Sequence, residues 1–126
     1  MKILLVDDSL AMRKIQKHAL KKAGYEDVLE AVDGLNALEK LEEINFKVDL
    51  IILDIDMPVM DGLTALKNLK GSKRSKHIPV IMCTAHSNQE NVVEALSGGA
   101  AAYIVKPFQQ LELTSKIAEI VPGVSP

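Results

Sequence analysis

Acidic residues gather in the stretch "DLIILDIDMPVMDG", residues 49–62, directly after an apolar run. Asp54 ends the apolar run, and Asp56 and Asp61 follow it with a Met-Pro pair between them. Burying a carboxylate is costly unless it is paired or bound to a metal. These acids therefore either lie at a solvated strand end or serve a chemical purpose.

Polar residues also follow other apolar runs of the chain. Asp7 and Asp8 come after the first run, Thr84 after the fourth and Lys106 after the fifth. If these runs are parallel strands, the residues just beyond them gather along one edge of the sheet, where such folds bind ligands. The pattern therefore predicts three carboxylates, with Asp54 as the third, beside a hydroxyl and an ammonium.

Three converging carboxylates need a cation or a proton. Two carboxylates about 4 Å apart repel each other by roughly 4 kcal/mol at an effective dielectric constant of about 20. Hard oxygen ligands without a Cys or His partner favour Mg²⁺, which also engages phosphate oxygens. A carboxylate held beside Mg²⁺ can attack a phosphoryl group, while Mg²⁺, Lys106 and Thr84 stabilise the charge on its oxygens.

The elements that position these residues follow from the apolar pattern. Continuous runs are typical of strands covered on both faces, and they occur as "ILLV" at 3, "VLEA" at 28, "LIIL" at 50, "VIMC" at 80 and "AYIV" at 102. Between them the period is helical, with apolar faces at Met12, Ile15, Ala19 and Ala23; Leu35, Leu38 and Leu41; Leu63, Leu66 and Leu69; Val92, Val93 and Leu96; and Leu113, Ile117, Ile120 and Val121. Gly24, Gly71 and Gly98-Gly99 follow helical runs where a left-handed cap is expected. Five strand-helix units predict an α/β fold with a parallel sheet and helices on both faces.

Length and charge restrict the class of protein. The 126 residues, 48% of them hydrophobic, suit one domain, residues 1–126. A formal charge of −2 gives no field that would attract nucleic acid or an anionic membrane. The apolar run in "MKILLVDD" is too short for a signal peptide or a membrane span, and one cysteine cannot form an internal disulfide. We expect a cytoplasmic protein.

Four motifs give the chain a resemblance to the receiver domains of two-component response regulators. In the family's order and spacing, they are "VDDS" at 6–9, "LDIDMPVMDG" at 53–62, "CTA" at 83–85 and "YIVKPF" at 103–108. The similarity runs from Lys2 to about Val121, and "DDSLAMRKI" at 7–15 is most similar to the stand-alone chemotaxis regulators. The resemblance implies a flavodoxin-like, doubly wound sheet of five strands in the order 2-1-3-4-5, with five helices.

For the acidic residues the resemblance implies one shared site. Asp54 would be the phosphoacceptor and, with Asp8, a direct ligand of Mg²⁺, whereas Asp7 would act through water. Asp56 would give the metal its backbone carbonyl, although this position often carries a neutral or longer side chain. Lys106 would contact the phosphoryl group.

The resemblance also implies a switch and partners. Thr84 and Tyr103 resemble the family's switch pair, and Lys106-Pro107 its cis peptide. A sensor histidine kinase or a histidine phosphotransfer domain would supply the phosphoryl group, and an effector, either a flagellar switch protein or a relay protein, would bind the phosphorylated form. The chain would be a monomeric signalling domain without an output domain, catalysing only its own phosphorylation and dephosphorylation.

Other functions have to be weighed against this one. Haloacid-dehalogenase-type phosphatases also use Asp-x-Asp after a strand, but here the acid pair comes first and no room is left for a cap domain. A degenerate receiver serving as a scaffold would lack some of the acids, the Thr or the Lys, and all are present. A chemotaxis messenger and a phosphorelay carrier both remain open.

Several residues have a purely structural explanation. Asp8 or Ser9 can cap the following helix, and Asp61-Gly62 can form a turn and helix start. His18, His77 and His86 show no metal-binding spacing, and Cys83 resembles a small buried hydrophobe. The basic residues of the first helix predict a solvated face, made by Arg13, Lys14, Lys17, Lys21 and Lys22.

Overall fold

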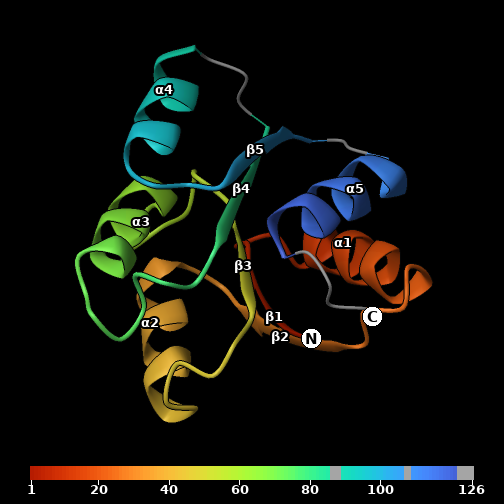
Figure 1. Ribbon diagram of the computed structural model, residues 1–126, viewed down its shortest axis with the longest axis horizontal. Helices are drawn as coiled ribbons and strands as arrows, with labels where there is room; N and C mark the ends of the chain where they lie inside the picture. The colour runs from red at the N-terminus through yellow and green to blue at the C-terminus, as the bar shows by residue number, and fades with distance from the viewer. Residues whose placement is uncertain (86–88, 107–108, 122–126) are drawn as a thin grey trace.

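A computed structural model describes residues 1–85, 89–106 and 109–121, and Figure 1 shows its strands running through the middle with helices on both sides. Strands and helices alternate along the chain as β1 (Lys2–Val6), α1 (Leu10–Lys22), β2 (Asp27–Ala31), α2 (Gly34–Glu43), β3 (Leu50–Leu53), α3 (Gly62–Lys70), β4 (Val80–Thr84), α4 (Gln89–Ser97), β5 (Ala102–Val105) and α5 (Gln110–Ile120). The predicted alternation is confirmed.

The sheet is parallel throughout, in the order β2-β1-β3-β4-β5 that the family resemblance implies. Helices α2, α3 and α4 pack on one face and α1 and α5 on the other, so the core has two layers divided by the sheet (Figure 1). The central strands β1, β3 and β4 are buried almost throughout, whereas the edge strands β2 and β5 are partly exposed. Burial on both faces explains why the central runs are continuously apolar.

Two of the predicted glycine caps are left-handed. Gly24 has φ +97° after α1, and Gly99 has φ +103° after α4. Gly71 was predicted to do the same and does not: its φ is −86°, because α3 ends in a right-handed turn whose Gly71 N–H still donates to the Lys67 carbonyl. The backbone therefore stays in the right-handed conformation where α3 ends.

The predicted apolar face of α1 is correct only in part, because Met12, Ala19 and Ala23 are half-buried but Ile15 is not. Ile15 is 59% exposed, and the buried residues of α1 are Arg13, Gln16 and Leu20. A similar shift occurs in α4, where Val93 is exposed and Ala95 is fully buried. In α1 a polar stripe faces the sheet because it meets polar partners there.

No helix in the described part of the chain is long and apolar enough to cross a membrane.

Candidate functional site

Three of the predicted acidic ligands meet at the carboxyl edge of the sheet. One carboxylate oxygen each from Asp7, Asp8 and Asp54 lies within 4.8 Å of the others. The register explains this convergence, because Val6 pairs with Leu53 and the next residues of β1 and β3 must then lie side by side. This set of three residues is called the acidic cluster below.

Lys106 supplies a counter-charge to the acidic cluster. Its Nζ lies 2.6 Å from Oδ2 of Asp7 and 3.4 Å from Oδ2 of Asp54. Burial would lower the pKa of Lys106, but the hydrogen bond to Asp7 and the charges of Asp54 and Asp7 outweigh it and hold the pKa above its usual value. Lys106 is therefore a fixed cation at the site.

Asp54 is 6% exposed, and its burial is the main cause of a raised pKa. The charge of Asp7 raises this pKa further, while Lys106 and the Ile55 N–H, which donates to Oδ1 of Asp54 at 2.8 Å, act in the opposite direction. Ionised Asp54 is thus under-compensated by the protein alone. A bound cation would supply the missing charge.

The backbone around Asp54 depends on Gly62. A Cβ at Gly62 would lie 1.9 Å from the carbonyl oxygen of Asp54, which no real side chain permits. The Gly62 N–H donates to the Ile55 carbonyl at 2.8 Å, and Asp61 caps α3 by accepting from the Thr64 N–H. The structural explanation for Asp61-Gly62 is confirmed, and its effect is to bring α3 against the base of the acidic cluster.

The remaining predicted site residues lie around the acidic cluster. Asp56 is exposed, and its carboxylate is not part of the group of three. Thr84 is fully buried at the end of β4, and Tyr103 is partly buried on β5. Burial is the main cause of a raised pKa of Tyr103, and the charges of Asp56 and Asp54 raise this pKa further. The Tyr103 hydroxyl is therefore close enough to the site to be affected by its charges. The predicted cis peptide includes Pro107, which lies outside the described residues.

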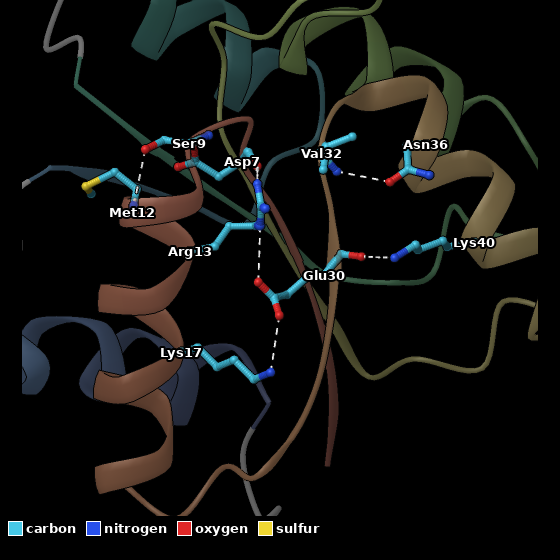
Figure 2. A network of polar contacts seen from close by, with 9 residues as sticks. All are labelled: Asp7, Ser9, Met12, Arg13, Lys17, Glu30, Val32, Asn36 and Lys40. Atoms are coloured by element: carbon cyan, nitrogen blue, oxygen red, sulfur yellow. Dashed lines mark hydrogen bonds and ion pairs between the residues drawn. The ribbon is translucent and has the colours of Figure 1, made fainter.

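Arg13 was predicted to belong to a solvated basic face, and that prediction is wrong. The residue is 9% exposed, and its Nη1 donates to the carbonyl oxygen of Asp7 at 2.6 Å. Its Nε donates to Glu30 at 3.1 Å, and Lys17 pairs with the other oxygen of the same carboxylate (Figure 2). Sequence reasoning missed Arg13 and Glu30 because nothing local in the chain links β1, α1 and β2.

Other residues have the structural roles expected of them. Ser9, not Asp8, caps α1 by accepting from the Met12 N–H, so Asp8 lies in the acidic cluster instead. Cys83 is buried, accepts a hydrogen bond from Gln16, and has its pKa raised to about 12 chiefly by burial. His18 and His77 are exposed, and His86 lies outside the described residues.

The donor set of the acidic cluster fits a magnesium ion. Its side-chain donors are all carboxylate oxygens, and two of the three residues are buried while Asp8 is exposed. Mg²⁺ is commonly bound by one or two carboxylates plus waters and phosphate oxygens, which a site open on one side allows. The acidic cluster could therefore hold a divalent metal ion.

Comparison with known proteins agrees with this geometry. Residues 3–118 match the model of the response regulator receiver domain. The chain is 45% identical over 125 residues to the chemotaxis protein CheY1 of Helicobacter pylori, covering 99% of both chains. It is 42% identical over 120 residues to the chemotaxis protein CheY-3 of Vibrio cholerae, covering 95% of this chain and 91% of that one.

Solved structures resemble the fold closely. The CheY chain of the CheX-CheY-BeF3-Mg+2 complex from Borrelia burgdorferi superimposes with a TM-score of 0.88 at 31% identity, covering 95% of this chain and 88% of that one. The CheY4 structure from Vibrio cholerae gives a TM-score of 0.85 at 36% identity, covering 95% and 98%. These matches favour a signalling receiver over a haloacid-dehalogenase-type phosphatase.

Proposed function

Because the chain belongs to the response regulator receiver domain family, we propose that Asp54 is the phosphoacceptor of a phosphorylation-activated signalling switch. The observation that carries the proposal is the contact of Lys106 with both Asp7 and Asp54 inside the acidic cluster. Asp8, Asp54 and the backbone carbonyl of Asp56 would hold Mg²⁺, with Asp7 acting through water. When bound, Mg²⁺ would neutralise charge on the phosphoryl oxygens.

The chain's own residues would then perform one transfer. A carboxylate oxygen of Asp54 attacks the phosphorus of a phosphohistidine, forming a P–O bond as the P–N bond breaks, and the released imidazole nitrogen takes a proton from water. Lys106 and the hydroxyl of Thr84 bind phosphoryl oxygens on the protein side. Attack of water on the phosphorus of the aspartyl phosphate would later break the P–O bond to Asp54 and release inorganic phosphate, so the chain would catalyse only its own phosphorylation and dephosphorylation.

The test uses a small acyl phosphate with Mg²⁺ and no kinase. Intact mass should rise by one phosphate, because the site itself orients the metal, nucleophile and phosphoryl group. The product should be stable in acid and labile in base. Labelling that survived Asp54→Ala, or that ran equally well in EDTA, would contradict the assignment of Asp54.

We further propose that residues 1–126 form one receiver domain that works as a cytoplasmic chemotaxis messenger. The similarity to chemotaxis proteins over nearly the whole chain supports the messenger over the relay carrier. A sensor histidine kinase or a histidine phosphotransfer domain would phosphorylate it. Pull-down with and without beryllofluoride tests this: a phospho-dependent flagellar switch protein supports the messenger, and a histidine phosphotransfer protein would favour the relay.

A further inference from the structure

Arg13 joins the acidic cluster to the neighbouring edge strand. Its side chain extends from α1, and the guanidinium donates both to the Asp7 carbonyl at the end of β1 and to Glu30 on β2. Figure 2 shows the side chain lying between these two partners. We propose that Arg13 is a positioning residue for metal binding, because it fixes the peptide unit that joins Asp7 to Asp8. The inference rests on the proposed function of that cluster.

The peptide unit between Asp7 and Asp8 is the geometric link. Its six atoms are nearly coplanar, so a hydrogen bond that fixes the Asp7 carbonyl also fixes the direction of the Asp8 N–H and Cα. The 2.6 Å contact from a guanidinium is a charge-assisted hydrogen bond, and the residue that makes it is buried. Asp8 is the exposed member of the acidic cluster, so its placement depends most on its backbone.

The other groups of Asp7 are already held. Its N–H donates to the Ala31 carbonyl at 3.1 Å, its Oδ1 accepts from the Ser9 N–H at 2.9 Å, and its Oδ2 accepts from Lys106. The contact from Arg13 adds the carbonyl to this set. The peptide unit between Asp7 and Asp8 is therefore held in place by a side chain of α1.

Glu30 keeps the guanidinium in place. Its carboxylate accepts from Arg13 at 3.1 Å and from Lys17 at 3.2 Å, and its main-chain carbonyl accepts from Lys40 of α2 (Figure 2). Its negative charge also offsets that of Arg13, so the guanidinium does not oppose a metal cation with its full charge. By pairing with Arg13, Glu30 thus allows a positively charged side chain to be buried beside a site that would bind a cation.

Lys17 provides a matched control. It pairs with the same Glu30 carboxylate from one turn further along α1, and its described contacts do not include Asp7. Arg13→Met and Lys17→Met each remove one positive charge and one ion pair of Glu30. By charge alone both variants should bind Mg²⁺ slightly more tightly, because a nearby cation is lost. Loss of positioning should instead weaken Mg²⁺ binding.

The experiment measures the dissociation constant of Mg²⁺ by calorimetric titration, together with amide hydrogen exchange without metal at Ser9, whose N–H donates to Oδ1 of Asp7. Arg13→Met should weaken Mg²⁺ binding about tenfold or more, the usual effect of removing a group that orients a ligand. Exchange at Ser9 should accelerate more than exchange at Leu66 in α3. Lys17→Met should stay within about twofold of the wild type in both measurements.

Two results would overturn the inference. One is an Arg13→Met variant that binds Mg²⁺ within about twofold of the wild type. The other is equal weakening by Lys17→Met. If Arg13→Met does not fold, Arg13→Lys takes its place, because it keeps the charge but lacks the planar guanidinium that contacts both Asp7 and Glu30. Unchanged Mg²⁺ binding in Arg13→Lys would also overturn the inference. A wild type that binds no Mg²⁺ would overturn the proposed function as well, so the two failures are distinguishable.

Discussion

The ammonium nitrogen of Lys106 lies 2.6 Å from Oδ2 of Asp7, and the two side chains are 9% and 1% exposed. Lys106→Met removes the cation and leaves Asp7 and Asp54 facing each other. We expect the free energy of unfolding in EDTA to fall by about 3 kcal/mol, because breaking a buried ion pair leaves an uncompensated charge. Saturating Mg²⁺ should recover part of this loss.

Urea unfolding with EDTA and with Mg²⁺ measures both effects for this variant. Lys116→Met is the control, because Lys116 forms a surface ion pair with Glu119 at 3.7 Å and should change stability by less than about 1 kcal/mol. An equal loss for Lys106→Met with and without metal would show that Lys106 does not neutralise the acidic cluster.

Asp54→Asn should stabilise the metal-free protein at neutral pH. Burial raises the pKa of Asp54 above its ordinary value of 3.8, so the folded state binds the proton more tightly than the unfolded state does. Ionised Asp54 therefore destabilises the fold fully above its folded pKa, and this penalty fades as the pH falls toward 3.8.

The gain from Asp54→Asn should accordingly be largest near neutral pH and shrink in acid. Urea unfolding in EDTA across this range measures it, and saturating Mg²⁺ should cancel it because the metal stabilises the wild-type carboxylate. A gain that is independent of pH would mean that charge is not the cause.

The edge that carries the acidic cluster could be predicted because one simple rule fixes it. Residues that follow parallel strands must meet at the same edge, so Asp7, Asp8 and Asp54 were identifiable from their places after apolar runs. No knowledge of packing was needed, since neighbouring strands set the distances.

The inner face of α1 could not be predicted in the same way. Helical periodicity places Ile15 inside, yet it is exposed while Arg13 is buried. The burial of Arg13 depends on Asp7 and on Glu30, which lies 17 residues along the chain on another strand. Polar partners that lie far away in the sequence produce no periodic pattern. In addition, the basic neighbours of Arg13 suggested a solvated face.

Val59 is strained in the loop between β3 and α3. Its φ is +68°, it is 78% exposed, and the Met60 N–H donates across it to the Pro58 carbonyl at 2.7 Å. A β-branched residue is unfavourable in the left-handed region, where Asn is tolerated. Val59→Asn should raise the free energy of unfolding by about 1 kcal/mol.

Thermal and urea unfolding measure this gain. Val93→Asn is the matched control, because Val93 is also an exposed valine but lies in the helix α4, where Asn is no better than Val. A similar gain in both variants would show that reduced surface hydrophobicity, not relief of strain, is responsible.

Asp56→Asn should change the lifetime of the aspartyl phosphate. The side chain of Asp56 is exposed two residues after Asp54, so its carboxylate can either orient the hydrolytic water or repel the phosphate. We expect the lifetime to change by about severalfold or more, with Mg²⁺ affinity within a few-fold of wild type, because the metal would use the backbone carbonyl. Decay of radiolabelled phosphoprotein measures the lifetime, and an unchanged value would show that this side chain points away.

We expect Thr84 and Tyr103 to connect the site to a more distant surface. Thr84 ends β4 and is fully buried, and Tyr103 lies on the adjacent strand β5 and packs against the core under α3 and α4. If the Thr84 hydroxyl moves to a phosphoryl oxygen, the Tyr103 ring can fill the space it leaves. The surface of α4, β5 and α5, where Leu96, Val105 and Leu111 are exposed, would then change shape.

The available energy limits this switch. Moving a population from 1:99 to 99:1 takes about 5.5 kcal/mol, whereas a charge-assisted hydrogen bond and a relocated aromatic ring supply about 2 to 4 kcal/mol. Unphosphorylated protein should therefore bind its effector weakly, and phosphorylation should tighten binding by roughly tens to hundreds of fold. Thr84→Ala should accept phosphate slowly and lose most of this gain, and Tyr103→Ala should accept it normally and lose the gain too. Effector titration with and without beryllofluoride measures the gain, and full tightening in both variants would mean that the signal leaves the site by another route.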